Sequence, residues 1–146
     1  MRTLRPFSYL VLIGVLVLAT TACDSAPQET HEVSMAPLHA MPLEVQQARV
    51  NVQQAYQFAV AHADLMKGLP CYCGCGALGH KSNYACYVQD VDASGAITFD
   101  GHALGCTICV DITQDAMRLL KQGKDAGGIL ATINQTYAKY GLSNLP

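Results

Sequence analysis

The sequence predicts a mainly α-helical domain with one small β-hairpin, in which three helices pack around cysteine-rich loops. Three observations support this fold class. Apolar residues recur at three- and four-residue steps in three separate segments, which is the spacing of an amphipathic helix. Two short stretches of alternating polarity flank a single turn signal, as in a hairpin. Six cysteines then fall between positions 71 and 109, outside the segments predicted as helices.

The first helix is expected over residues 43–66. Pro42 suits the first turn of a helix, because it lacks the N–H that would be unpaired there. Gly68 and Pro70 end the helix. His62 is interpreted as a surface residue rather than a ligand, because the helix dipole favours a protonated imidazole near a C-terminus. The apolar stripe contains Val45, Val52, Tyr56, Ala59 and Ala63.

A hairpin is expected in the middle of the chain. Residues 84–91 and 96–100 alternate enough to form strands, and the run Asp92-Ala93-Ser94-Gly95 is a good turn between them. The same run resembles the first half of an EF-hand calcium loop. Gly101 stands where that loop needs a bidentate glutamate, and the flanks read as strands. A plain hairpin turn is therefore the favoured interpretation.

Two further helices are expected towards the C-terminus. The second runs to Lys121, with Asp111 or Thr113 as its N-cap. The third covers residues 126–140 and can be capped by Asp125. The buried face of the second helix is predicted to contain Ala116, Leu119 and Leu120, and the apolar stripe of the third contains Ile129, Leu130, Ile133, Tyr137 and Tyr140.

The N-terminus reads as an export signal over residues 1–22. Two arginines precede an apolar run at positions 9–18, and small residues follow immediately before Cys23. The apolar run is short for a membrane span, which needs about 20 residues.

Cys23 stands where the lipidated cysteine of a bacterial lipoprotein would stand. Thr20 occupies the position at which such signals usually carry leucine, so ordinary cleavage after Ala22 stays open as the alternative. With lipidation, the mature chain would have two parts. Cys23 would anchor it to a membrane, residues 23–42 would be a flexible tether, and residues 43–146 would form the cysteine-rich domain.

The predicted tether carries prolines and no apolar periodicity, so it is expected to be flexible. Its composition is nevertheless rich in potential ligands, since imidazole and thioether groups bind copper, the thioether especially Cu(I). The plainest interpretation is still a polar linker. The residues concerned are His31, Met35, His39 and Met41.

Charge and composition exclude several classes of function. Removing the two arginines of the signal from nine Lys and Arg residues leaves seven against eleven Asp and Glu, a net charge of −4. The sequence has no cluster of basic residues that would bind nucleic acid. It also has neither a Gly-rich phosphate-binding loop nor the Gly-x-Ser-x-Gly motif that carries a nucleophilic serine. No nucleophile–base pair or carboxylate pair indicates hydrolysis, so the protein is not expected to be an enzyme.

The run Pro70-Cys71-Tyr72-Cys73-Gly74-Cys75 carries the most specific chemical signal. Alternate cysteines can line one face of an extended chain, or the glycines can let the backbone curl so that the sulfurs converge. Neighbouring Cys-x-Cys pairs rarely close a disulfide with each other, because the geometry is strained. Thiolates can bridge several soft ions, so the spacing suits a Cu(I)–thiolate cluster.

Cys86, Cys106 and Cys109 complete the six sulfurs. The two-residue gap between Cys106 and Cys109 is that of a metal knuckle, and it also occurs in thiol–disulfide oxidoreductases, where a helix dipole lowers a thiol pKa. No βαβ pattern surrounds it, which disfavours a thioredoxin-like fold. Disulfide staples, with 15 connectivities for six cysteines, are a further alternative.

Two histidines accompany the cysteines. His80 and His102 each follow a glycine and lie within a few residues of a cysteine, so both are candidate ligands. Six cysteines and two histidines also make up two zinc sites of Cys₃His type, so zinc stays open. The alternating cysteines and the His/Met tether favour copper, and the loops between the three helices are therefore predicted to bind metal.

The segment Pro70–Gly76 resembles the signature of the PCYCGC motif-containing lipoproteins of bacteria. The resemblance continues through His80, Cys86, His102 and the Cys106–Cys109 pair, and it covers roughly residues 64–140. It implies an exported, membrane-tethered, cysteine-rich domain that binds metal.

Together these observations predict a lipid-anchored protein on the extracytoplasmic side of the cell membrane. It would capture, store or deliver a soft metal, most simply Cu(I), and exchange it with a copper-donor or copper-acceptor protein. A zinc-stabilised or disulfide-stapled interaction module, and a thiol–disulfide oxidoreductase using Cys106 and Cys109, are the alternatives. The predicted ligands are Cys71, Cys73, Cys75, Cys86, Cys106, Cys109, His80 and His102.

Overall fold

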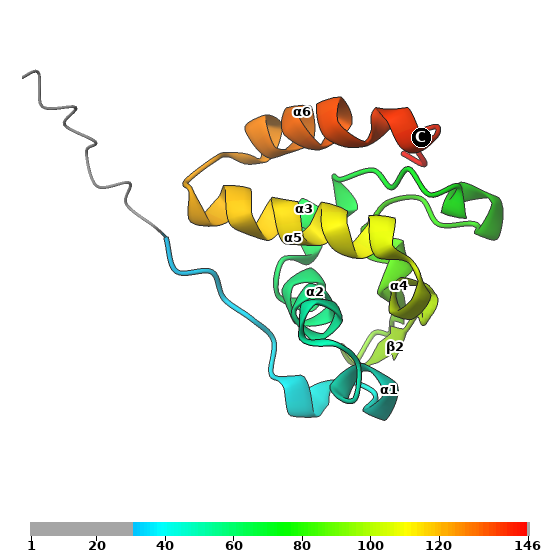
Figure 1. The fold of residues 1–146 in the computed structure, drawn as a ribbon. Helices are drawn as coiled ribbons and strands as arrows, with labels where there is room; N and C mark the ends of the chain where they lie inside the picture. The colour runs from blue at the N-terminus through cyan, green and yellow to red at the C-terminus, as the bar shows by residue number, and fades with distance from the viewer. Residues whose placement is uncertain (1–30, 146) are drawn as a thin grey trace, which may run out of the picture.

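A computed structural model describes residues 31–145 of the chain (Figure 1). The predicted signal peptide, Cys23 and the first part of the predicted tether lie outside the described residues. Within residues 31–145, no helix combines the length and apolar character needed to cross a membrane.

Three longer helices form the body of the domain. Helix α5 (Thr107–Lys121) packs against α2 (Val50–Ala61) on one side and against α6 (Ala126–Tyr137) on the other (Figure 1). Helix α5 is buried on both sides for this reason, as its residues Val110, Ile112, Ala116 and Leu119 show. The largest fully buried side chains around it are Tyr56, Tyr87, Phe58, Met66, Leu69, Ile112, Ile129 and Ile133. The predicted mainly helical fold class is confirmed.

The first predicted helix is present but interrupted. Its residues form α1 (Leu43–Gln46), α2 and α3 (Ala63–Lys67). The Gln53 side-chain amide donates to the carbonyls of Gln46 and Ala48, so the first break leaves these acceptors satisfied. The second break falls at His62, whose ring bonds to Ser34. Side-chain hydrogen bonds thus accompany both interruptions of the helix that the periodicity alone predicted.

Residues 31–42 differ from the expected flexible tether. The His31 N–H donates to the Lys121 carbonyl, and Ala36 exchanges two hydrogen bonds with Gln57 of α2. Met41 is only 5% exposed and belongs to the core. The segment has no helical period, but it carries isolated apolar side chains that pack on the domain, namely Val33, Ala36 and Leu38. The packed body thus begins before residue 43.

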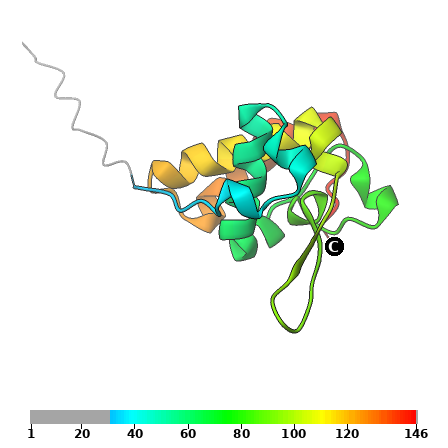
Figure 2. The ribbon, with the colours of Figure 1, turned by 90° about the horizontal axis from the view of Figure 1, so that it is seen from below.

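The hairpin matches its prediction in type and turn. Strands β1 (Val88–Val91) and β2 (Ile97–Phe99) are antiparallel, with an irregularity between Val88 and Asp90. Asp92 Oδ1 accepts the N–H groups of Ser94 and Ala96, and Gly95 has a φ of +87°, which glycine adopts without strain. The hairpin projects from the helical body (Figure 2). It is a plain turn, as predicted, and not a calcium loop between helices.

Three boundaries near the cysteines were not predicted. Residues Tyr84–Cys86 form a 3₁₀ turn rather than the start of a strand. A short helix α4 (His102–Gly105) follows the hairpin, and α5 begins at Thr107, several residues earlier than expected. At the C-terminal end the structure lies closer to the prediction. Asp125 caps α6 by accepting the Gly128 N–H, and residues 138–140 continue α6 as a 3₁₀ turn.

Candidate metal centre

The Pro70–Gly76 loop curls so that its sulfurs converge. Gly74 has a φ of +84°, in the left-handed region that favours glycine, and a 3₁₀ turn (Cys75–Leu78) follows it. This bend buries Cys71 and Cys75 and leaves Cys73 partly exposed. The Sγ atoms of Cys71 and Cys73 lie 3.3 Å apart. Of the two arrangements that the sequence allowed, the curled one is observed.

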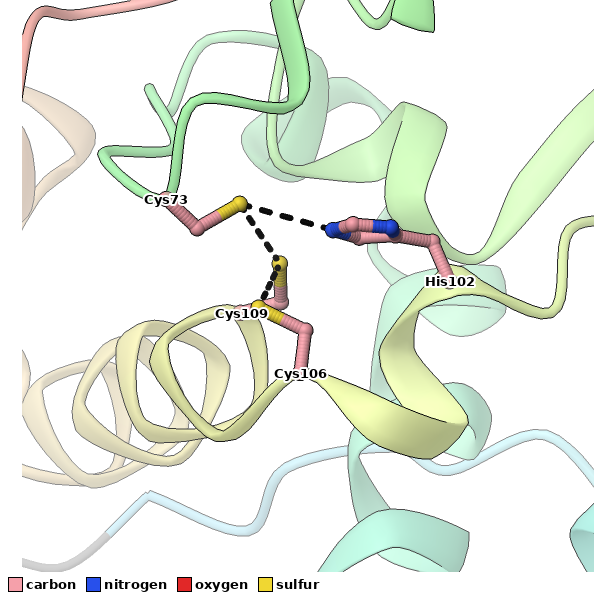
Figure 3. Close-up of side chains that lie close together, drawn as sticks. All are labelled: Cys73, His102, Cys106 and Cys109. Atoms are coloured by element: carbon pink, nitrogen blue, oxygen red, sulfur yellow. Dashed lines mark hydrogen bonds between the residues drawn. The ribbon is translucent and has the colours of Figure 1, made fainter.

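The N-terminus of α5 supplies the opposite side of the cluster. Cys106 is the N-cap residue of α5 and Cys109 lies in its first turn, with 3.3 Å between their sulfurs (Figure 3). The sulfur of Cys109 lies 3.2 Å from that of Cys71 and 3.6 Å from that of Cys73. The buried Tyr87 hydroxyl donates to the Cys109 carbonyl and so fixes this turn against the core.

Both predicted histidines face the sulfurs. His102, at the start of α4, places Nε2 3.4 Å from Cys73 Sγ (Figure 3). His80 places Nδ1 3.6 Å from Cys86 Sγ, which in turn lies 3.6 Å from Cys75 Sγ. The two imidazole rings are nearly perpendicular, with their centroids 5.2 Å apart.

All eight predicted ligands therefore lie in one cluster, although ligation by them stays a prediction. Their donor atoms fall into four overlapping groups, and within each group all donor atoms lie within 4.8 Å of one another. The neighbouring sulfurs are 3.2–3.6 Å apart. That is well beyond a disulfide bond of about 2.05 Å and close to the roughly 3.8 Å that Zn–S bonds of about 2.3 Å would give around a tetrahedral ion. The groups are Cys73, His102, Cys106 and Cys109; Cys75, His80, Cys86 and His102; Cys71, Cys73 and Cys75; and Cys71, Cys86 and Cys109.

None of the six cysteines of residues 31–145 forms a disulfide in this structure. Hydrogen bonds from Cys109 and Cys86 hold the pKa of the Cys71 thiol far below its ordinary value. The hydrogen bond between Cys71 and Cys109 raises the pKa of Cys109 in turn. Burial raises the pKa of Cys73 and of Cys75.

Asp100 orients both histidines, and sequence reasoning missed it. One carboxylate oxygen lies 3.4 Å from His80 Nε2, and the other accepts the backbone N–H of His102 at 2.7 Å. The Tyr56 hydroxyl donates to the Asp100 carbonyl and fixes its backbone. A carboxylate on the far nitrogen of an imidazole is the usual outer partner of a metal-ligating histidine. The only indication of this role in the sequence is that Asp100 directly precedes Gly101 and His102.

Asn144, close to the C-terminus, holds the cysteine loop from outside. Its side chain accepts the Cys71 N–H at 2.6 Å and donates to the His80 carbonyl at 3.0 Å. The same amide nitrogen lies 3.5 Å from Cys75 Sγ. Its backbone N–H donates to the Cys71 carbonyl. Asn144 is 73 residues from Cys71, so no local pattern in the sequence could have indicated this contact.

The two histidines of the predicted tether do not belong to the donor groups. Met41 is buried in the core, so packing accounts for its thioether. None of the four donor groups includes His31 or His39. His62 is also outside them, as predicted, and bonds to Ser34 instead. His31 and His39 therefore add no donor to the four groups.

The fold and the cluster define a small helical, cysteine-rich protein with a candidate metal centre. The chain belongs to the family described as a protein of unknown function with PCYCGC motif, whose model matches residues 13–144. The resemblance inferred from the sequence is thereby confirmed. No curated protein and no solved structure matches the chain.

Replacing Asp100 with asparagine is expected to weaken metal binding about 10- to 100-fold, the usual effect of losing an outer partner of a ligating histidine. The amide can still accept the His102 N–H but no longer attracts the His80 ring. Competition with a metal chelator measures the affinity. Asp90→Asn, an exposed residue of the same hairpin, is the matched control. Equal affinities for the two variants would show that Asp100 has no role at the centre.

Proposed function

We propose that the protein binds a soft metal ion, Cu(I), outside the cytoplasm and serves in its capture, storage or delivery. The observation that carries this proposal is the convergence of six sulfurs and two imidazoles from separate segments into one cluster. Soft thiolate ligands select Cu(I), zinc and iron–sulfur clusters over hard cations.

The way the donor groups overlap favours copper over zinc. Both four-donor groups contain His102, so two separate tetrahedral zinc sites would compete for the same imidazole. The two all-sulfur groups share Cys71 instead. A thiolate can bridge two soft ions, which makes Cys71 a natural centre for a multinuclear Cu(I)–thiolate cluster.

Zinc is the second candidate function, as a structural ion in an interaction module. It is favoured by one observation: Cys73, His102, Cys106 and Cys109 form a group of the Cys₃His type found in structural zinc sites. Thiol–disulfide exchange by Cys106 and Cys109 is less supported. The described residues contain only a two-stranded hairpin, so the surroundings are not those of a thioredoxin-like enzyme.

The proposed location follows from the N-terminal sequence. An export signal over residues 1–22 and a lipid on Cys23 would hold the domain at the extracytoplasmic side of the membrane. Disulfides form readily outside the cytoplasm. A bound soft ion would keep these thiols from oxidising, and a copper-donor or copper-acceptor protein would then exchange the ion.

Metal analysis and free-thiol counting on anaerobically purified mature protein test the proposal. Several equivalents of copper, with six thiols titratable after metal removal, are the expected result. One or two equivalents of zinc, found in place of copper, would support the structural-ion function instead. Absence of metal together with six oxidised sulfurs would overturn both in favour of disulfide staples.

A further inference from the structure

The eight donors differ in their access to solvent, and this difference divides the cluster into two halves. Cys71, Cys75, Cys86 and Cys109 are at most 2% exposed. Cys73 and Cys106 are the two partly exposed cysteines of the described chain, and His102 beside them is also partly exposed. Three of the four partly exposed donors therefore belong to one group, which Cys109 completes (Figure 3), and the fourth is His80, whose side chain is 12% exposed.

We propose that this group, Cys73, His102, Cys106 and Cys109, is an outer site at which metal ions enter and leave. Cys75, Cys86 and His80 then form an inner site that holds its ion longer. This inference rests on the proposed function and deepens it, because it assigns different roles to the two halves of one cluster.

A small depression in the surface adjoins the outer site at Cys106 and is the proposed approach for an incoming carrier. It lies where the start of α2 meets the junction of α4 and α5, and Cys106 is part of its wall. Leu104, at 37% exposure, lies beside it. The other residues around Cys106 in this wall are Arg49, Gly105, Thr107 and Asp111. Cys75, Cys86 and His80 do not line this depression.

Cys71 connects the two halves. Its sulfur lies 3.3 Å from Cys73 and 3.2 Å from Cys109 of the outer site. It also shares one donor group with Cys75 and another with Cys86. An ion can therefore pass from the outer to the inner half by exchanging one sulfur at a time, without ever losing all its sulfur ligands.

Each transfer is a ligand exchange without a redox change. The ion arrives as Cu(I) on a thiol-bearing carrier. Bonds form from copper to the Cys106 and Cys73 sulfurs, while the bonds to the carrier's sulfurs break. The two protons released by Cys106 and Cys73 go to the carrier's thiolates or to water, and copper stays Cu(I) throughout.

Withdrawal of copper by a chelator tests the proposal directly. The fully Cu(I)-loaded mature protein is mixed anaerobically with excess of a chromogenic Cu(I) chelator, and the absorbance is followed in time. Two phases are expected, separated at least tenfold in rate. In Cys106→Ser the fast phase should disappear or become at least tenfold slower, while the slow phase stays. In Cys75→Ser the amplitude of the slow phase should fall. Thr98→Ser, an exposed residue of β2 outside every donor group and outside the depression, should leave both phases unchanged.

Alkylation of the metal-free protein gives a readout independent of copper. Cys73 and Cys106 should react at least tenfold faster with a neutral alkylating reagent than the buried cysteines, as determined by peptide mass spectrometry. Equal labelling of all six, or copper withdrawal in one phase that Cys106→Ser does not alter, would overturn the inference while leaving copper binding intact. A wild-type chain that takes up no Cu(I) would instead remove the proposed function itself.

Discussion

Replacing Cys71 with serine is expected to lower the affinity for Cu(I) more than any other single cysteine substitution, by at least about 100-fold, or roughly 2.8 kcal/mol. Cys71 belongs to both all-sulfur groups and is completely buried. Its loss therefore removes a ligand from the outer and the inner half at once. A serine hydroxyl is a harder ligand than a thiolate and does not replace it for a soft ion. Competition against a Cu(I) chelator of known affinity measures the change.

Cys106→Ser is the matched control for this experiment, because Cys106 is partly exposed and belongs to one donor group only. Its affinity loss should be clearly smaller. Circular dichroism of the metal-free variants checks that both fold. The double variant Cys71→Ser/Cys73→Ser gives the strictest test: if it kept the full affinity for copper, the Pro70–Gly76 loop would not be part of the site.

The candidate ligands could be predicted from sequence because their chemistry is carried by residue type and spacing. All eight donors come together in the structure, and Asp125 caps its helix as its local sequence indicates. The convergence itself was only one of two arrangements open to the Pro70–Gly76 loop. It depends on the left-handed Gly74 and on the fit of α5 against the loop.

The features missed by sequence reasoning are those set by contacts between distant residues. Asp100 and Asn144 reach the site from the hairpin and the C-terminal tail, and neither lies in a periodic pattern. The break between α1 and α2 is stabilised by Gln53, which a helical wheel shows as an ordinary polar position. Residues 31–42 pack on the domain through single apolar side chains, although the composition of this segment alone predicted a linker.

The cluster brings together donors from segments that lie far apart in the sequence. Its donors come from the Pro70–Gly76 loop, the 3₁₀ turn at Cys86, the start of α4 and the start of α5. The buried thiols also belong to the hydrophobic core, where free cysteine packs as a small apolar residue. The metal-free chain should therefore keep its helices, in contrast to small zinc domains that unfold without their ion.

Removing the metal is nevertheless expected to lower the free energy of unfolding by about 4 kcal/mol, if the loaded protein is compared at free metal about 1,000 times its dissociation constant. An ion that binds the native cluster more tightly than the unfolded thiols stabilises the native state by this amount, and binding to unfolded cysteines would reduce it. Anaerobic denaturant unfolding of loaded and chelator-treated protein measures the difference. Cys71→Ser should show a smaller difference at the same total metal concentration, because its affinity is lower. Identical stabilities of loaded and metal-free wild-type protein would show that the ion does not bind to the folded cluster, even if metal co-purified with the chain.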